Sequence, residues 1–124
     1  MAKPTRFTCP IGPSTNNLFV NRSRGIQGGR FKDADYRRWL HDAGWIVKLQ
    51  HPAPVLGIVA VLIEAPLHRR RDLDNSLKAA LDLIVQLGLI ENDNLIDDLH
   101  IIRRGTDAAN MIVSIWPLSD SSLS

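Results

Sequence analysis

The clearest structural signal in the chain runs over residues 55–88, with the sequence VLGIVAVLIEAPLHRRRDLDNSLKAALDLIVQLG. Its first part, 55–65, is almost wholly apolar and rich in β-branched side chains, which predicts a buried central strand that ends at Pro66. The segment 74–87 has helical periodicity, with core-facing positions at Leu77, Ala80, Leu81, Ile84 and Leu87. Gly88 then takes the position of a glycine that ends a helix.

The connection between this strand and this helix places three arginines, Arg69, Arg70 and Arg71, directly before a pair of carboxylates. Guanidinium groups suit phosphate oxygens because their planar donor forks match that geometry. Asp72 and Asp74 suit a hard divalent cation such as Mg²⁺, which prefers oxygen ligands. A simpler interpretation makes one of them an N-cap and the other a first-turn acid, but it leaves the adjoining arginines unexplained. The combination indicates phosphodiester hydrolysis, and therefore a nuclease.

Lys78 lies in the first turn of the predicted helix, where the helix dipole disfavours a cation. It follows Asp74 by four residues, so an ordinary ion pair along one helix face is one interpretation. The other interpretation is a cation beside the metal that stabilises negative charge developing at the scissile phosphate. A residue that breaks a local rule is expected at functional sites.

Asp93 lies in an acidic turn, 91–98, that follows the predicted helix. A strand–helix–turn excursion could return it to the side of Asp72 and complete a cluster of three carboxylates. The acids that compete with it for this role are Glu91, Asp82, Asp97 and Asp98. Of these, Asp82 is expected to be a surface partner of Lys78, and the last two to lie at the surface before the following strand.

Local patterns predict the remaining elements. They are a strand at 6–9, a long loop at 11–31 with a hairpin near Gly28-Gly29, a helix at 33–48, strands at 99–104 and 110–116 around a turn at Gly105, and a frayed tail at 117–124. Asp33 is a candidate N-cap or first-turn acid of the 33–48 helix, whose apolar stripe is Tyr36, Leu40, Ala43 and Val47. A loop as long as 11–31 in a small domain is typical of functional or disordered segments. Asn16 and Asn17 within it suit either turn formation or phosphate contact.

The order β-α-β-α-β-β predicts the α+β class. We expect a single domain over 1–124, built as a two-layer sandwich with a mixed β-sheet and both helices packed on one face. The length of 124 residues and the 44% hydrophobic content support one modest core. No apolar run has the length of a membrane span, and no signal peptide is apparent. The single cysteine, Cys9, fits a reducing cytoplasm and is expected to be a buried strand residue.

Charge is distributed unevenly along the chain although the formal net charge is only +2. Basic residues concentrate at 22–38, 69–71 and 103–104, whereas seven of the thirteen acids lie between 72 and 98. Basic patches around a concentrated acidic site fit an enzyme that acts on a polyanion better than a protein that coats DNA. No Cys/His cluster has zinc spacing.

These motifs together resemble the RusA-type Holliday-junction resolvases. The specific part of the resemblance is residues 69–75 (RRRDLDN), continued by 78–80 (KAA), Asp82, Gly88 and Asp93. Residues 12–17 (GPSTNN) are similar to the family's Pro-Ser-Asn loop, and 29–32 (GRFK), followed by Tyr36 and Arg37, to its helix entry. The chain departs from the family pattern in two places, because Asn92 stands where an Asp-Asp pair is common and Thr15 is an apparent insertion.

The resemblance implies a small homodimeric endonuclease of phage or prophage origin that cuts four-way DNA junctions with Mg²⁺, for which Mn²⁺ can substitute. It implies that Asp72, Asp74 and Asp93 hold the metal and that Lys78 is the catalytic lysine. It also implies DNA contacts by Arg69, Arg70, Arg71, Asn16, Asn17, Arg30 and Lys32. No organic cofactor and no membrane are expected, and the location would be the cytoplasm of a bacterial or phage-infected cell.

Three alternatives to a Holliday-junction resolvase in recombination and repair remain open. The first is a nuclease of the same chemistry that acts on other branched or single-stranded DNA. The second is a non-catalytic junction-binding protein, which the intact set of two aspartates and a lysine argues against. The third is a small-molecule phosphohydrolase, which is disfavoured because the chain lacks a phosphate-cradling glycine loop before a helix.

Overall fold

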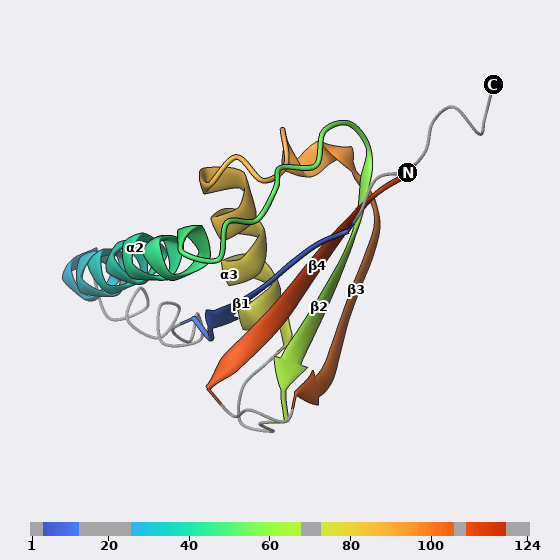
Figure 1. Ribbon diagram of the computed structural model, residues 1–124. Coiled ribbons are helices and arrows are strands. Elements are labelled where there is room, and N and C mark those ends of the chain that lie inside the picture. The colour runs from blue at the N-terminus through green and yellow to red at the C-terminus, as the bar shows by residue number, and fades with distance from the viewer. Residues whose placement is uncertain (1–3, 13–25, 68–72, 106–108, 119–124) are drawn as a thin grey trace.

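A computed structural model describes residues 4–12, 26–67, 73–105 and 109–118 of the chain. In chain order the elements are β1 (Thr5–Pro10), α2 (Ile26–Lys48), β2 (Val59–Pro66), α3 (Leu73–Gln86), the short 3-10 helix η1 (Asp93–Leu95), β3 (Ile96–Gly105) and β4 (Asn110–Pro117). Figure 1 shows these elements with the two helices stacked against one side of a twisted sheet. The predicted β-α-β-α-β-β order and α+β class are confirmed.

The four strands form one mixed sheet in the order β1-β4-β2-β3. Strand β2 pairs in parallel with β3 and antiparallel with β4, and β4 also pairs antiparallel with β1. The two C-terminal strands are therefore separated by β2, although they follow each other in the sequence. Because β2 and β3 are parallel, their C-terminal ends meet at the same edge of the sheet, where Pro66 lies opposite Gly105.

The core lies between the sheet and the two helices. Strand β2 contributes Val59, Val61 and Ile63 to it, and the alternating residues face the other side of the sheet, as the pleat requires. The predicted stripe of α2 is confirmed, with Tyr36, Ala43 and Val47 buried and Leu40 partly buried; on α3 the most buried side chains are Ala79, Ala80, Leu83 and Ile84. Neither helix, within the residues described, is both long and apolar enough to span a membrane.

Cys9 is buried on β1, as its sequence context predicts. Burial raises the pKa of its thiol from 9.0 to about 12, because the thiolate would lose its hydration. The thiol therefore stays protonated and is a packing group at neutral pH.

The first helix is longer than the sequence indicates. Helix α2 begins at Ile26, so residues 26–31, including Gly28 and Gly29, are helical, and the predicted hairpin there is wrong. Asp33 lies inside the helix and is not its N-cap. The two glycines lower helix propensity, but extending an existing helix adds one hydrogen bond per residue, which overrides a weak local preference. The rest of the predicted loop, residues 13–25, lies outside the described residues, as does most of the predicted tail.

Two strand boundaries also differ from the sequence prediction. Strand β2 begins only at Val59, because Gly57 has a φ of 80° and bends the chain before it. Strand β3 begins at Ile96 and includes Asp97 and Asp98, whose side chains are exposed on this edge strand. Charged side chains are common on edge strands because they discourage pairing with other chains.

Helix α3 ends as predicted, at a glycine in the left-handed region. Gly88 has a φ of 70°, its N–H donates to the carbonyl of Val85, and the N–H of Leu89 donates to the carbonyl of Ile84. This pair of hydrogen bonds is a Schellman motif. It satisfies carbonyl groups at the end of the helix and turns the chain toward η1.

Candidate active site at the start of helix α3

Strand β2 and helix α3 flank the segment that carries the strongest sequence motif. Arg69, Arg70, Arg71 and Asp72 lie outside the described residues, as do Asn16, Asn17 and His68. Arg30 and Lys32 belong to helix α2, and their side chains are likewise outside the description. The described part of the site is therefore the first two turns of α3 and the side chains that contact them.

Asp74 is exposed in the first turn of α3, where a carboxylate is stabilised by the helix dipole. Its oxygens are the type of ligand that a hard divalent cation prefers. Lys78 lies one turn later and is also exposed. Its ion pair is formed with Asp82, whose Oδ2 lies 3.2 Å from Lys78 Nζ, rather than with Asp74. The prediction that Asp82 is the surface partner of Lys78 is confirmed.

Tyr36 of helix α2 joins this pair from the neighbouring helix. Its hydroxyl donates to the same Oδ2 atom of Asp82 at 2.5 Å, and Lys78 Nζ lies 5.5 Å from the centroid of its ring. Burial, and then the hydrogen bond and charge of Asp82, raise the pKa of Tyr36 well above its ordinary value, so the phenol remains a donor. Lys78 is thus held between a carboxylate and an aromatic face.

The entrance to the N-terminal loop lies beside this part of α3. A Cβ atom added to Gly12 would lie 2.8 Å from the Cβ of Ala79, so a side chain at this position would collide with the helix. Gly12 also lies against the ring of Trp39, which stacks on Tyr36 with a centroid distance of 5.9 Å. The chain therefore enters the segment that leads to Asn16 and Asn17 from a position against Ala79, the residue that follows Lys78.

Asp93 occupies the opposite end of the same helix. Asp74 follows the C-terminal end of β2, whereas η1 directly precedes Ile96, which pairs with Val59 at the start of β2 (Figure 1). Between them, the fourteen residues of α3 form a helix about 20 Å long at 1.5 Å per residue. The two segments therefore lie toward opposite ends of β2, and the expected return of Asp93 to the side of Asp72, which lies outside the described residues, stays a prediction.

Asp93 is exposed as the first residue of η1, which Asn92 caps by accepting a hydrogen bond from the N–H of Asn94 at 3.1 Å. The described residues contain no group of three or more His, Cys, Asp or Glu side chains that could hold a metal ion.

Comparison with known proteins gives the family. The profile of the family described as Endodeoxyribonuclease RusA matches residues 10–116. The chain belongs to the RusA family. It is 34% identical over 99 residues to the crossover junction endodeoxyribonuclease of Enterobacteria phage HK97, covering 79% of this chain and 81% of the relative. It is 32% identical over 88 residues to the crossover junction endodeoxyribonuclease RusA of Aquifex aeolicus (strain VF5), covering 68% and 70% respectively.

Two features of this RusA family member escaped the sequence interpretation. The helical periodicity places Tyr36 in the core, but it does not predict the hydrogen bond from its hydroxyl to Asp82. Glu64 was treated as part of the apolar strand at 55–65. Its side chain is only 10% exposed and contacts Arg6 and Arg104. A single glutamate inside such a run was the signal, because buried carboxylates need cationic partners.

Proposed function

We propose that this chain is a metal-dependent, structure-selective endonuclease that resolves Holliday junctions by phosphodiester hydrolysis during DNA recombination and repair. The observation that carries the proposal is the family match over 10–116, which spans the arginine run, Asp72, Asp74, Lys78 and Asp93. The names of both relatives support the same activity. Its place of action would be the cytoplasm of a bacterial or phage-infected cell, where such DNA is found.

Asp72 and Asp74 would hold Mg²⁺, with Mn²⁺ as a substitute. The exposed carboxylate of Asp74 fits this role, because it supplies oxygen ligands from the first turn of a helix. A divalent ion held there would help to activate water for attack on the phosphate and would neutralise charge on the reacting group. The protein contributes the position of Asp74 in the first turn of α3, directly after the loop that follows β2.

Lys78 would stabilise the negative charge that develops on the phosphate in the transition state. Its contacts with Asp82 and Tyr36 restrict the ammonium group to a small region beside the first turn of α3. Asp82 is therefore a positioning residue, since it acts through Lys78. Part of the Nζ donor set remains available, because an ammonium carries three N–H groups and the side chain is 55% exposed.

A homodimer would explain how Asp93 can take part in a site that contains Asp74. Because Asp74 follows the C-terminal end of β2 and Asp93 precedes Ile96, which pairs at the start of β2, we expect a site that uses both carboxylates to take Asp93 from a second copy. A dimer with two-fold symmetry would then contain two such shared sites, which matches the approximate two-fold symmetry of a four-way junction. Both carboxylates are exposed, so neither is prevented from meeting a partner chain.

Arg69, Arg70 and Arg71 would bind the phosphate backbone beside the metal, and Asn16, Asn17, Arg30 and Lys32 would extend this contact. The position of Gly12 supports the inclusion of the N-terminal loop, because that loop starts against α3 one residue from Lys78. These residues would supply most of the affinity for DNA, and this affinity should depend strongly on salt.

One gel assay tests the function. A synthetic four-way junction incubated with the purified chain should be cut by a pair of nicks in the presence of Mg²⁺ and remain intact with EDTA. A flap, a fork and a linear duplex of the same sequence serve as controls and should be cut far more slowly. Equal cleavage of flap and junction would favour a less selective nuclease, and tight junction binding without any cleavage would favour a non-catalytic binding protein.

A further inference from the structure

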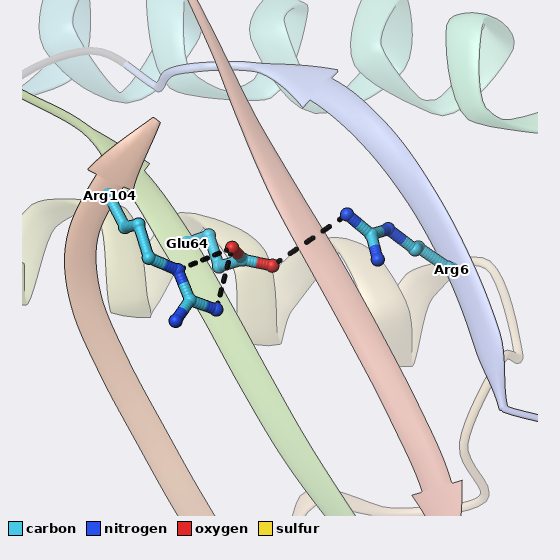
Figure 2. A network of polar contacts seen from close by, with 3 residues as sticks. All are labelled: Arg6, Glu64 and Arg104. Carbon is cyan, nitrogen blue, oxygen red and sulfur yellow. Dashed lines mark hydrogen bonds and ion pairs between the residues drawn. The ribbon is translucent and has the colours of Figure 1, made fainter. Parts of the chain in front are cut away.

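The face of the sheet opposite the helices carries a cluster of three charged side chains, one from each of three strands. We call Arg6 of β1, Glu64 of β2 and Arg104 of β3 the open-face cluster. Figure 2 shows the carboxylate of Glu64 between the two guanidinium groups. Glu64 alternates with the core residue Ile63 along β2, so its side chain lies on the face that the helices leave uncovered.

The contacts within the open-face cluster are unequal. Arg104 donates to Glu64 Oε2 from Nε at 3.0 Å and approaches the same oxygen with Nη2 at 2.9 Å. Arg6 is more distant, with its Nη2 at 4.0 Å from Oε1. Since Arg104 alone balances the charge of Glu64 through two charge-assisted contacts to Oε2, the second arginine is not needed to neutralise the carboxylate.

The exposure of the cluster members differs between the carboxylate and the two arginines. The side chain of Glu64 is 10% exposed, whereas those of Arg6 and Arg104 are 64% and 61% exposed. Two cations and one covered anion leave a net positive charge at the surface. A guanidinium group carries five N–H donors in one plane, and the contacts to Glu64 use one edge of Arg104. The cluster therefore presents donors outward that suit a phosphate group.

The position of the cluster connects it to the candidate active site. Arg104 directly precedes Gly105, which pairs with Pro66 at the C-terminal edge shared by β2 and β3. The arginine run begins three residues beyond Pro66 in the sequence. A nucleic acid backbone held at that edge can continue over the open face of the sheet without crossing the helices, which lie on the other side (Figure 1).

We propose that Arg6 and Arg104 bind the phosphate backbone of the DNA substrate on the open face of the sheet, with Glu64 as the positioning residue that fixes the guanidinium of Arg104. This proposal rests on the proposed function, because it assigns a second contact surface to the same DNA. DNA is favoured over a second copy of the chain because the outward groups carry net positive charge, which two-fold symmetry would place against itself.

The test measures how junction binding depends on salt. Binding to a four-way junction is measured in Ca²⁺, which allows no turnover in most Mg²⁺ nucleases, over a series of salt concentrations. Arg6→Gln and Arg104→Gln should each lower the slope of log affinity against log salt by about one unit, as expected for one lost phosphate contact. Lys48→Gln, which removes a cation at the far end of α2, is the matched control and should leave the slope unchanged.

A variant that keeps the net charge distinguishes a direct phosphate contact by Arg104 from a change in the overall charge of the protein. It also avoids leaving a buried carboxylate unpaired, which could impair folding. Arg104→Gln alone leaves the buried carboxylate of Glu64 without its main partner, so it can lower stability. The double variant Glu64→Gln/Arg104→Gln removes both charges and keeps the net charge of the wild-type chain. It should still lose about one unit of slope if Arg104 touches phosphate.

Unchanged slopes for Arg6→Gln and for the double variant, in folded protein, would overturn the proposal. Dissociation of a dimer by these variants in sedimentation velocity, with the slope retained, would also overturn it and assign the face to a second copy. Both outcomes leave cleavage by the wild-type chain intact, so they are distinct from a failure of the proposed function. If the proposed function itself were wrong, the wild-type chain would not cut the junction.

Discussion

Lys78 is the residue on which the chemical and structural interpretations differ most. Its ion pair with Asp82 is exposed, and surface pairs one helical turn apart contribute only about 0.3–0.5 kcal/mol. A purely structural lysine would therefore be nearly dispensable. A lysine that stabilises charge in the transition state would affect turnover far more than folding or binding.

We expect Lys78→Ala to slow cleavage by roughly 10²–10³, the scale seen when one transition-state donor is removed. Junction affinity and thermal stability should change little. Single-turnover cleavage, a binding titration and thermal melting of the same preparation measure the three effects. A variant that melts slightly earlier but cuts normally would remove the catalytic role from Lys78.

The position of Asp82 can be tested through the same lysine. If Asp82 acts only by holding Lys78, Asp82→Asn should slow cleavage in the wild-type background and have no further effect when Lys78 is already alanine. Tyr36→Phe removes the other contact to Asp82 and is the matched control for loss of its hydrogen bond. Additive losses in the double variant would show that Asp82 contributes independently of Lys78.

At the level of elements, local sequence signals predicted correctly which helices and strands are present. They predicted the first and last residues of these elements less accurately. The strand–helix unit around β2 and α3 was predicted because an apolar run and a helical period are separated by a proline and closed by a glycine. The start of α2 was predicted too late because two glycines near it have low helix propensity. The helix nevertheless continues through them, since extending an existing helix is favourable. Strand β3 was predicted too short because acids on an edge strand resemble a turn.

The Schellman motif at the end of α3 makes a quantitative prediction for Gly88. Nothing lies within 4 Å of a Cβ atom added there, so the cost of Gly88→Ala is conformational and comes from its φ of 70°. We expect a loss of about 1 kcal/mol in the free energy of unfolding, measured by urea denaturation. Gly88→Asn should lose less, because asparagine tolerates the left-handed region. An alanine variant as stable as wild type would contradict this assignment.

At the level of the whole molecule, the sequence predicted which side chains lie together on one helix but not how segments distant in sequence are placed. Asp74, Lys78 and Asp82 are spaced four residues apart, and a helix places residues at this spacing on the same face. Asp93 is separated from them by the length of that helix, and a crossover to a parallel strand must carry the chain to the opposite edge of the sheet. The open-face cluster was missed because it joins three strands that are distant in sequence.

A subunit-mixing experiment tests whether the site is shared between two copies. Asp74→Asn and Asp93→Asn should each be inactive alone, yet retain junction binding because the phosphate contacts remain. In a mixed dimer, one of the two sites would combine an intact Asp74 from one chain with an intact Asp93 from the other. Mixing the two inactive proteins after partial denaturation and refolding should therefore restore nicking at one strand.

The control for this experiment is each variant carried through the same refolding alone. Without complementation in a mixture that sedimentation shows to be dimeric, Asp93 would not act in the site of its partner. Nicking restored only by the mixture would support both the dimer and the metal-binding role of the two carboxylates.

The strand order has a consequence for how the protein folds during its synthesis. Strand β1 lies at the sheet edge beside β4, with Thr5 opposite Ile115, so its backbone ladder closes a loop that spans most of the chain. Such long-range closure slows folding because its entropic cost precedes any reward from contacts. Until β4 emerges from the ribosome, β1 with its apolar residues Phe7 and Cys9 has no neighbouring strand to pair with, so these side chains stay uncovered by the sheet until synthesis is almost finished.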